Sequence, residues 1–190
     1  MVLIVGLTSG FGCGKSTVAS AFIELGTEVL DLDKVVKKVS KIPELKKRIQ
    51  KEFGTTNSEK LAEKVFSSPA DLKKLNSIIH PKVFAELKET ISNHRKSGKI
   101  LVVEIPLLYE TKSANLFDFV LVVDCSRKNQ LERLLKRGFS KKDALKRIRA
   151  QLPLQEKLKK ADLVIDNNGS IEGTAKQVIL INNFLKALNK

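Results

Sequence analysis

Runs of consecutive apolar residues recur along the chain, and polar residues bound each run. They occupy residues 2–7, 27–31, 100–106, 119–124 and 163–166, the second being the least apolar. A strand that is buried on both faces of a parallel sheet has this continuous apolar pattern. Helical periodicity separates the runs, and strands that alternate with helices predict a doubly wound α/β sheet.

The longest helical region covers residues 34–97, where charged and apolar residues alternate with helical spacing. Ser68 is placed as an N-cap before Pro69, which predicts the start of one helix. Pro81 predicts the start of another, ended by Gly98. The pattern therefore predicts several helices that form a helical subdomain.

Two further helices are predicted after residues 119–124, because Gly138 interrupts the pattern and Ser140 restarts it. A last amphipathic helix closes the chain, and its expected buried face consists of Val178, Ile181, Leu185 and Leu188.

The first apolar run leads into a glycine-rich segment, SGFGCGKST, from Ser9 to Thr17. Glycines allow backbone N–H groups to turn inward, and the helix that follows adds its unpaired N-terminal donors. Lys15 can then reach the β- and γ-phosphates of a nucleotide, and the Ser16 hydroxyl can bind Mg²⁺. The usual P-loop begins with glycine where this chain has Ser9. The context still predicts a phosphate site made of Phe11, Gly12, Cys13, Gly14, Lys15, Ser16 and Thr17.

Polar residues follow several predicted strands, and in a doubly wound sheet the carboxyl ends of strands form the ligand site. Asp31 and Asp33 follow the second run, Glu104 lies near the end of the third, and residues 167–169 follow the last. Asp33 is equally consistent with a base that accepts a hydroxyl proton and with a helix cap. Glu104 either acts on Mg²⁺ through water or is a polar strand end.

Basic residues dominate the segment from Arg127 to Lys160, where 13 Lys and Arg stand against three acidic residues, +10 of the chain's +14. Such a segment fits a lid over polyphosphate substrates, a nucleic-acid surface or a solvated lysine-rich surface. One Tyr and no Trp in the chain disfavour base stacking. Arg137, at the break between the two basic helices, is placed like a lid arginine that clamps phosphates; Arg133, Arg147 and Arg149 are weaker candidates.

Length and composition set the remaining expectations. The 190 residues fit one compact domain, 42% are hydrophobic, and no apolar run approaches the roughly 20 residues of a membrane span. The start of the chain shows no basic leader. Cys13 and Cys125 lack metal-type spacing. We expect Cys13 to be a small filler of the loop, both thiols to be reduced, and the protein to be cytoplasmic, without a membrane or nucleic-acid partner.

Several sequence blocks together resemble the dephospho-CoA kinase family. They are residues 7–19 and 29–33, LNSIIHP at 75–81, IPLLYE at 105–110 and VIDNNG at 164–169. The resemblance runs over nearly the whole chain, although residues 55–60 shorten a segment that is longer in most of the family. It implies ATP-dependent phosphorylation of the ribose 3′-hydroxyl of dephospho-CoA by a P-loop kinase core, about 1–33, 98–137 and 161–190, with a helical acceptor-binding subdomain (34–97) and a lid (138–160).

The resemblance also assigns roles to single residues. Asp33 is implied as the base, with Lys15 and Arg137 as the other catalytic residues and Asn168 and Gly169 near the adenine. Acceptor contacts are implied for Thr8, Asp31, Asp33, His80, Pro106 and Leu107. His80 by itself fits the entrance of a helix better than a catalyst. We expect a monomer or weak homo-oligomer.

Two other classes compete with this interpretation. Another small-molecule or nucleotide kinase with a similar lid is the nearer one, although adenylate-type kinases usually carry GKGT where this chain has GKST. A regulatory GTPase is disfavoured because the chain has no Asn-Lys-x-Asp motif to recognise guanine.

Overall fold

The computed structural model describes residues 2–189, so Met1 and Lys190, the ends of the predicted core, lie outside the described residues. The chain divides into two compact units. The larger consists of Met1–Asp31 and Ile91–Lys190, and the smaller of Leu32–Thr90. Residues 138–160, the predicted lid, belong to the larger unit.

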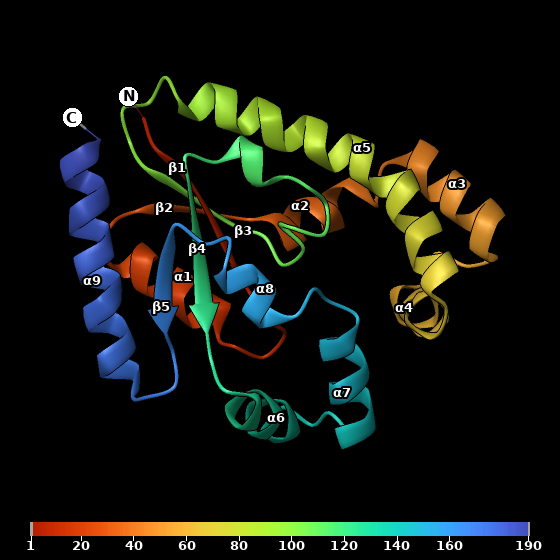
Figure 1. Cartoon of the computed structure of the whole chain (residues 1–190). Helices are drawn as coiled ribbons and strands as arrows, with labels where there is room; N and C mark the ends of the chain where they lie inside the picture. The colour runs from red at the N-terminus through yellow and green to blue at the C-terminus, as the bar shows by residue number, and fades with distance from the viewer. Residues whose placement is uncertain (1, 190) are drawn as a thin grey trace. The chain divides into compact units, whose positions relative to one another are not determined.

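The larger unit is built on a five-stranded sheet in the order β2-β3-β1-β4-β5, with every pair parallel (Figure 1). The strands are β1 (Ile4–Ser9), β2 (Glu28–Asp31), β3 (Leu101–Glu104), β4 (Phe119–Asp124) and β5 (Leu163–Asp166). This confirms the predicted parallel α/β sheet. All five carboxyl ends lie at one edge, which is where the glycine-rich segment leaves β1.

One face of the sheet is covered by α1 (Lys15–Glu24) and α9 (Ile171–Leu188), which form a continuous apolar core with the strands. Fully buried members of this core include Val5, Phe22, Leu121, Val178 and Leu185. Leu188 does not belong to the buried face, because 47% of its surface is exposed at the end of α9. Asn182 takes an inward position instead and accepts a hydrogen bond from Thr27.

The basic part of the chain folds as three short helices, α6 (Arg127–Lys136), α7 (Lys141–Arg149) and α8 (Leu154–Leu158). The break at Gly138 is confirmed, since this residue has a φ of 87° and Ser140 caps α7 by accepting from the Asp143 N–H. The helix α8 was not predicted, because five residues are too few to show a helical period.

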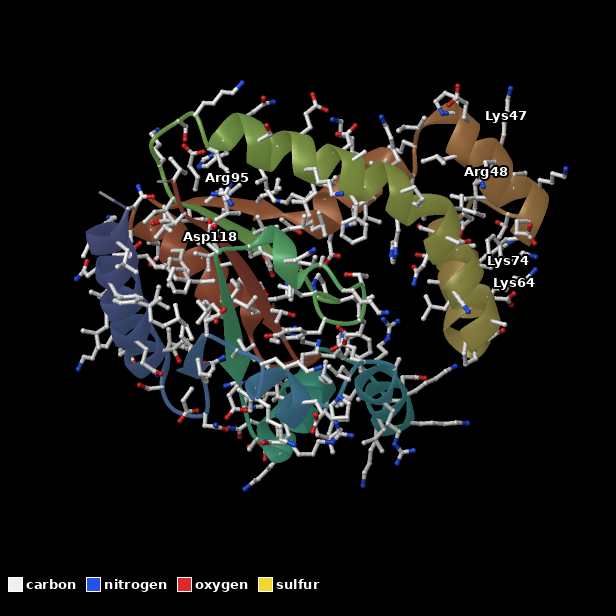
Figure 2. All side chains as sticks on the ribbon, turned by 45° about the horizontal axis from the view of Figure 1, so that its top comes forward. Lys47, Arg48, Lys64, Lys74, Arg95 and Asp118 are labelled. Carbon is white, nitrogen blue, oxygen red and sulfur yellow. The ribbon has the colours of Figure 1, made fainter. Side chains whose placement is uncertain are left out.

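Side chains also fasten the start of β1. Arg95 donates to the Val2 carbonyl and to Asp118, and the other carboxylate oxygen of Asp118 accepts the Ile4 N–H at 2.7 Å (Figure 2). Asp118 follows the short 3₁₀ helix η1 (Ala114–Leu116), so the pair joins the first strand to the connection before β4.

The smaller unit contains α2 (Leu32–Val39), α3 (Pro43–Phe53), α4 (Ser58–Ser67) and most of α5 (Pro69–His94). Its buried apolar residues include Ile49, Phe53, Val65, Val83 and Leu87. Two of the lysines that Figure 2 labels make contacts within the unit. Lys64 donates to the Phe53 carbonyl and lies over its ring, and Lys74 pairs with Glu52.

The predicted helix start at Pro81 is wrong, because α5 continues through this residue to His94. The start at Ser68 is confirmed by its side-chain contact with the Asp71 N–H. Pro81 is exposed and removes one backbone donor, while Ile78, Ile79 and Val83 around it stay buried. The apolar packing on both sides of the proline therefore outweighs the lost hydrogen bond.

Among the helices of residues 2–189, none is both long enough and apolar enough to cross a membrane.

Candidate functional site

The segment from Ser9, the last residue of β1, to Gly14, just before α1, is called the phosphate loop below. Gly12 and Gly14 have φ values of 85° and 87°, and a Cβ on Gly12 would come within 2.9 Å of the Leu134 side chain. The Cys13 N–H donates to the Gly10 carbonyl and closes a tight turn. Turns with left-handed residues of this kind form concave runs of backbone N–H groups that bind anions. The positive end of the α1 dipole lies beside them.

The outer side of the phosphate loop is held by side chains from α6 and from the end of β5. The Cys13 carbonyl accepts from Arg133 Nη1 at 3.2 Å and from Asn167 Nδ2 at 2.7 Å. Gln130 donates to the Phe11 carbonyl, and Thr174 fixes the Asn167 amide by donating to its Oδ1. Sequence reasoning missed Gln130, although its spacing from Arg133 places both on one side of α6.

Lys15 opens α1 and lies at the carboxyl edge of the sheet. Its Nζ is 2.5 Å from Glu104 Oε1, and both side chains are largely buried. Asp31 lies directly opposite Glu104 in the β2–β3 register, and Thr8 donates to the Pro106 carbonyl after β3. The larger unit thus brings together the predicted residues Thr8, Lys15, Asp31 and Pro106.

The two cysteines meet beneath the phosphate loop, and both are free and buried. The Cys125 thiol donates to Cys13 Sγ at 2.9 Å, and Gln130 donates to the same sulfur at 3.3 Å. The hydrogen bond from Cys125 lowers the pKa of Cys13, and the same contact raises the pKa of Cys125. Cys13 is fully buried and fills the space under the loop, as expected from its small side chain.

The predicted adenine residues, Asn168 and Gly169, lie exposed in the turn after β5. Asn168 Oδ1 accepts from the Ser126 N–H at 2.6 Å and from the Asn129 amide, which ties the turn to the start of α6. Nearby, Asp124 and Asp166 are opposite each other at the ends of β4 and β5. Burial raises the pKa of Asp124, and repulsion from Asp166 adds a smaller effect in the same direction.

The basic segment contacts the phosphate loop through aromatic rings. Phe11 and Phe139 meet edge to face with centroids 5.7 Å apart, and the Arg147 guanidinium lies 5.7 Å from the first ring and 5.2 Å from the second. Arg137 is the C-cap residue that follows α6, and it is exposed. Leu107 lies in the turn after β3, where its carbonyl accepts from Thr111.

Two predicted site residues, Asp33 and His80, belong to the smaller unit. Asp33 is exposed in the first turn of α2, which begins at Leu32, so it is not the residue before the helix that a cap requires. His80 lies within α5, so its interpretation as a helix entrance is wrong. Burial lowers the pKa of His80, whose ring packs edge to face on Phe84.

The phosphate loop fits a magnesium ion that is bound mainly through a nucleotide. No group of three or more His, Cys, Asp or Glu suited to a metal occurs among residues 2–189. Mg²⁺ in nucleotide sites uses few protein ligands, together with phosphate oxygens and waters. Ser16, exposed in the first turn of α1, supplies a hard hydroxyl oxygen of the required kind.

Comparison with known proteins gives one consistent result. The sequence model described as dephospho-CoA kinase matches residues 3–173. A dephospho-CoA kinase of Carboxydothermus hydrogenoformans is 42% identical over 189 residues, which cover 94% of this chain and 92% of the relative.

Two solved structures are also similar to this chain. The crystal structure of TT1252 from Thermus thermophilus superposes with a TM-score of 0.83 at 32% identity, covering 97% of this chain and 98% of the other. A dephospho-CoA kinase from Campylobacter jejuni gives a TM-score of 0.76 at 28% identity over the full length of both chains.

Proposed function

Because this chain belongs to the dephospho-CoA kinase family, we propose that it transfers the γ-phosphoryl group of ATP to the ribose 3′-hydroxyl of dephospho-CoA. The products are CoA and ADP, and the reaction is a step of CoA biosynthesis. The observation that carries the proposal is the meeting of Lys15, Glu104 and Asp31 at the carboxyl edge of the sheet, directly after the phosphate loop.

Phosphoryl transfer depends on positioning and on neutralising phosphate charge. The phosphate loop supplies backbone N–H groups and the α1 N-terminus for the β-phosphate. Lys15 leaves Glu104 and turns to the β- and γ-oxygens, where its charge opposes the charge of the transferred group. Glu104 holds the Lys15 ammonium until nucleotide arrives, which keeps a largely buried charge paired.

The acceptor hydroxyl must lose its proton as the new P–O bond forms. Asp33 is the proposed base, and Asp31 supports it from the end of β2. Only Leu32 separates the two, and this residue is buried at the start of α2. Arg137 is proposed to stabilise charge on the transferring group.

A magnesium ion fits this site with Ser16 as its protein ligand. When bound, Mg²⁺ neutralises charge on the β- and γ-phosphates. The protein's own part is to hold the Ser16 hydroxyl beside the phosphate loop at the fixed first turn of α1.

The remaining site residues bind and enclose the substrates in this proposal. Thr8, His80, Pro106 and Leu107 contact dephospho-CoA, residues 34–97 form the acceptor-binding subdomain, and residues 138–160 form the lid. Asn168 and Gly169 border the adenine. We place the enzyme in the cytoplasm, where its free thiols stay reduced, as a monomer or weak homo-oligomer that does not bind nucleic acid.

An acceptor panel tests the reaction. ADP release is measured with ATP and Mg²⁺ in the presence of dephospho-CoA, nucleoside monophosphates, shikimate or adenosine, and the product is identified by mass spectrometry. We expect release only with dephospho-CoA, together with a product heavier by one phosphoryl group. Preferential turnover of another acceptor would contradict the proposal. A magnesium-chelator arm should abolish turnover, and added magnesium should restore it.

A further inference from the structure

Lys157 is a buried lysine in the most basic part of the chain, for which a solvated lysine-rich surface was one of three interpretations. Its exposed fraction is 0%, whereas the nearby Lys159 side chain is 69% exposed. It lies on α8, the last of the three helices of the basic segment. Burying an ammonium group raises the free energy of the folded state unless all its donors are paired. The groups that pair with Lys157 therefore indicate why it is buried.

The ammonium has three partners, which match its three donors. Nζ donates to the Ser9 carbonyl at 3.2 Å and to the Pro106 carbonyl at 3.1 Å, and it pairs with Glu110 Oε1 at 2.9 Å. Ser9 is the last residue of β1, and Pro106 follows β3. One cation therefore ties together the carboxyl ends of two neighbouring strands at the start of the phosphate loop.

We propose that Lys157 is a positioning residue for nucleotide binding, which fixes the direction in which the chain enters the phosphate loop. The Ser9 carbonyl belongs to the peptide that joins β1 to Gly10, so its hydrogen bond sets the orientation of the first loop peptide. The Ser9 hydroxyl donates to the Gly10 carbonyl at 2.9 Å and supports the same turn. The inference rests on the proposed function, because it needs the loop to bind ATP phosphates.

Glu110 provides the counter-charge that lets the ammonium stay buried. Its Oε1 also accepts the Leu152 N–H at 2.9 Å, while its Oε2 is buried without a hydrogen-bond partner in the described part of the chain. A buried pair with one unsatisfied oxygen is a poor source of stability compared with apolar packing. The arrangement is better explained by what the ammonium does to the two carbonyls.

The test compares Lys157→Met with two variants. Glu110→Gln alters the ion pair but leaves both carbonyl contacts, and Lys176→Met removes an exposed lysine of α9, outside the proposed lid. For each, we measure the melting temperature, the Kd of a non-hydrolysable ATP analogue without acceptor, and kcat and KM for ATP, at a temperature where the protein is fully folded. Misplacement of reacting groups by about 1 Å can cost about 10²-fold in rate. We expect Lys157→Met to raise the Kd and the KM for ATP by about tenfold or more, and both controls to stay within about threefold of wild type.

Nucleotide constants within twofold of wild type in folded Lys157→Met would overturn the inference, and so would an equal loss in Glu110→Gln, since the cause would then be packing around the ion pair. If Lys157→Met does not fold, Lys157→Arg decides. This variant keeps the charge, but a planar guanidinium cannot donate to both carbonyls and to Glu110 from the same buried volume. A wild-type KM for ATP in Lys157→Arg overturns the inference. Failure of the wild-type protein to turn over ATP would instead refute the proposed function.

Discussion

At the scale of single residues, Lys15 shows how the site is prepared before nucleotide binds. Its ammonium is paired with Glu104 at 2.5 Å, so the charge is already at the sheet edge. We predict that Lys15→Ala lowers kcat/KM for ATP by at least about 10²-fold, since an aimed charge on the transferred group is lost. The fold should stay intact, although the melting temperature falls because largely buried Glu104 loses the Lys15 charge. Lys99→Ala, which removes an exposed lysine paired with Glu28, is the matched control and should keep full activity.

A second prediction concerns Asp33, because a catalytic role and a helix-stabilising role predict different losses when it is replaced. As an acid in the first turn of α2, it interacts with the helix dipole, which is worth about 0.3–1 kcal/mol. A positioned base is worth about 10²–10⁴ in kcat. Asp33→Asn should therefore melt close to wild type and bind ATP normally, while transfer to dephospho-CoA falls by at least 10²-fold.

Asp71 offers the matched control, because it is the acid in the first turn of α5. Asp71→Asn should have a similar small effect on stability and none on kcat. Turnover by Asp33→Asn within a few-fold of wild type would show that the base is another residue, and Asp31 would be tested next.

Single residues also show how far the sequence could predict the site. Lys15, Ser16 and the alternating glycines are contiguous, so their motif was visible. Gln130 and Lys157 reach the phosphate loop from 117 and 148 residues away, respectively. Nothing local distinguishes Lys157 from its exposed neighbours, because burial of a lysine depends on the carbonyls that tertiary folding brings to it.

At the scale of elements, the apolar runs of β4 and β5 matched the strand bounds, whereas one of the two prolines interpreted as helix starts did not mark one. β4 and β5 begin and end where their runs do. β4 is buried on both faces, which explains its continuous apolar pattern, whereas β5 is an edge strand in which Val164 is 46% exposed. Pro81 has the local character of a helix start, yet α5 passes through it. The apolar residues on either side of Pro81 are buried, so tertiary packing overrides the local preference.

The neighbouring residue on α5, His80, predicts a pH dependence of stability. Burial lowers its pKa below the ordinary value of about 6.5. As the pH falls below about 6.5, the unfolded chain gains a proton that native His80 resists, so the free energy of unfolding decreases down to the native pKa. His80→Gln should flatten this part of the curve, by at most about 1.4 kcal/mol per pH unit.

Urea unfolding at several pH values between about 5 and 8 measures the effect. His94→Gln, which changes the other histidine of the chain, is the control and should keep the His80 contribution. An unchanged difference between acid and neutral pH in His80→Gln would contradict the prediction.

At the scale of the whole molecule, charge is concentrated in the segment that follows β4. Arg137 is the C-cap of α6 and lies beside Gly138, at the break before α7. We predict that Arg137→Ala lowers kcat with ATP and dephospho-CoA by about 10-fold or more, because a cation that acts on transition-state charge contributes to the chemical step. Lys136→Ala removes the adjacent cation and should have little effect. Equal losses in the two variants would indicate a general effect of charge instead of a specific clamp.

The same segment should change its dynamics when both substrates bind. The Phe11–Phe139 contact and the Arg147 guanidinium over both rings anchor the segment to the phosphate loop. Between residues 138 and 150, Ala144 is the one fully buried apolar side chain. So few buried contacts are typical of a segment that opens at low free energy. Closure over two polyphosphate substrates adds charge pairing for its lysines and arginines, which stabilises the closed form only when both are present. Hydrogen exchange of residues 138–150 should therefore be fast in the free protein, little changed with ATP analogue or dephospho-CoA alone, and clearly slowed with both. Equal protection in the free protein would mean that the segment is a fixed part of the core, and the lid would have to be sought elsewhere.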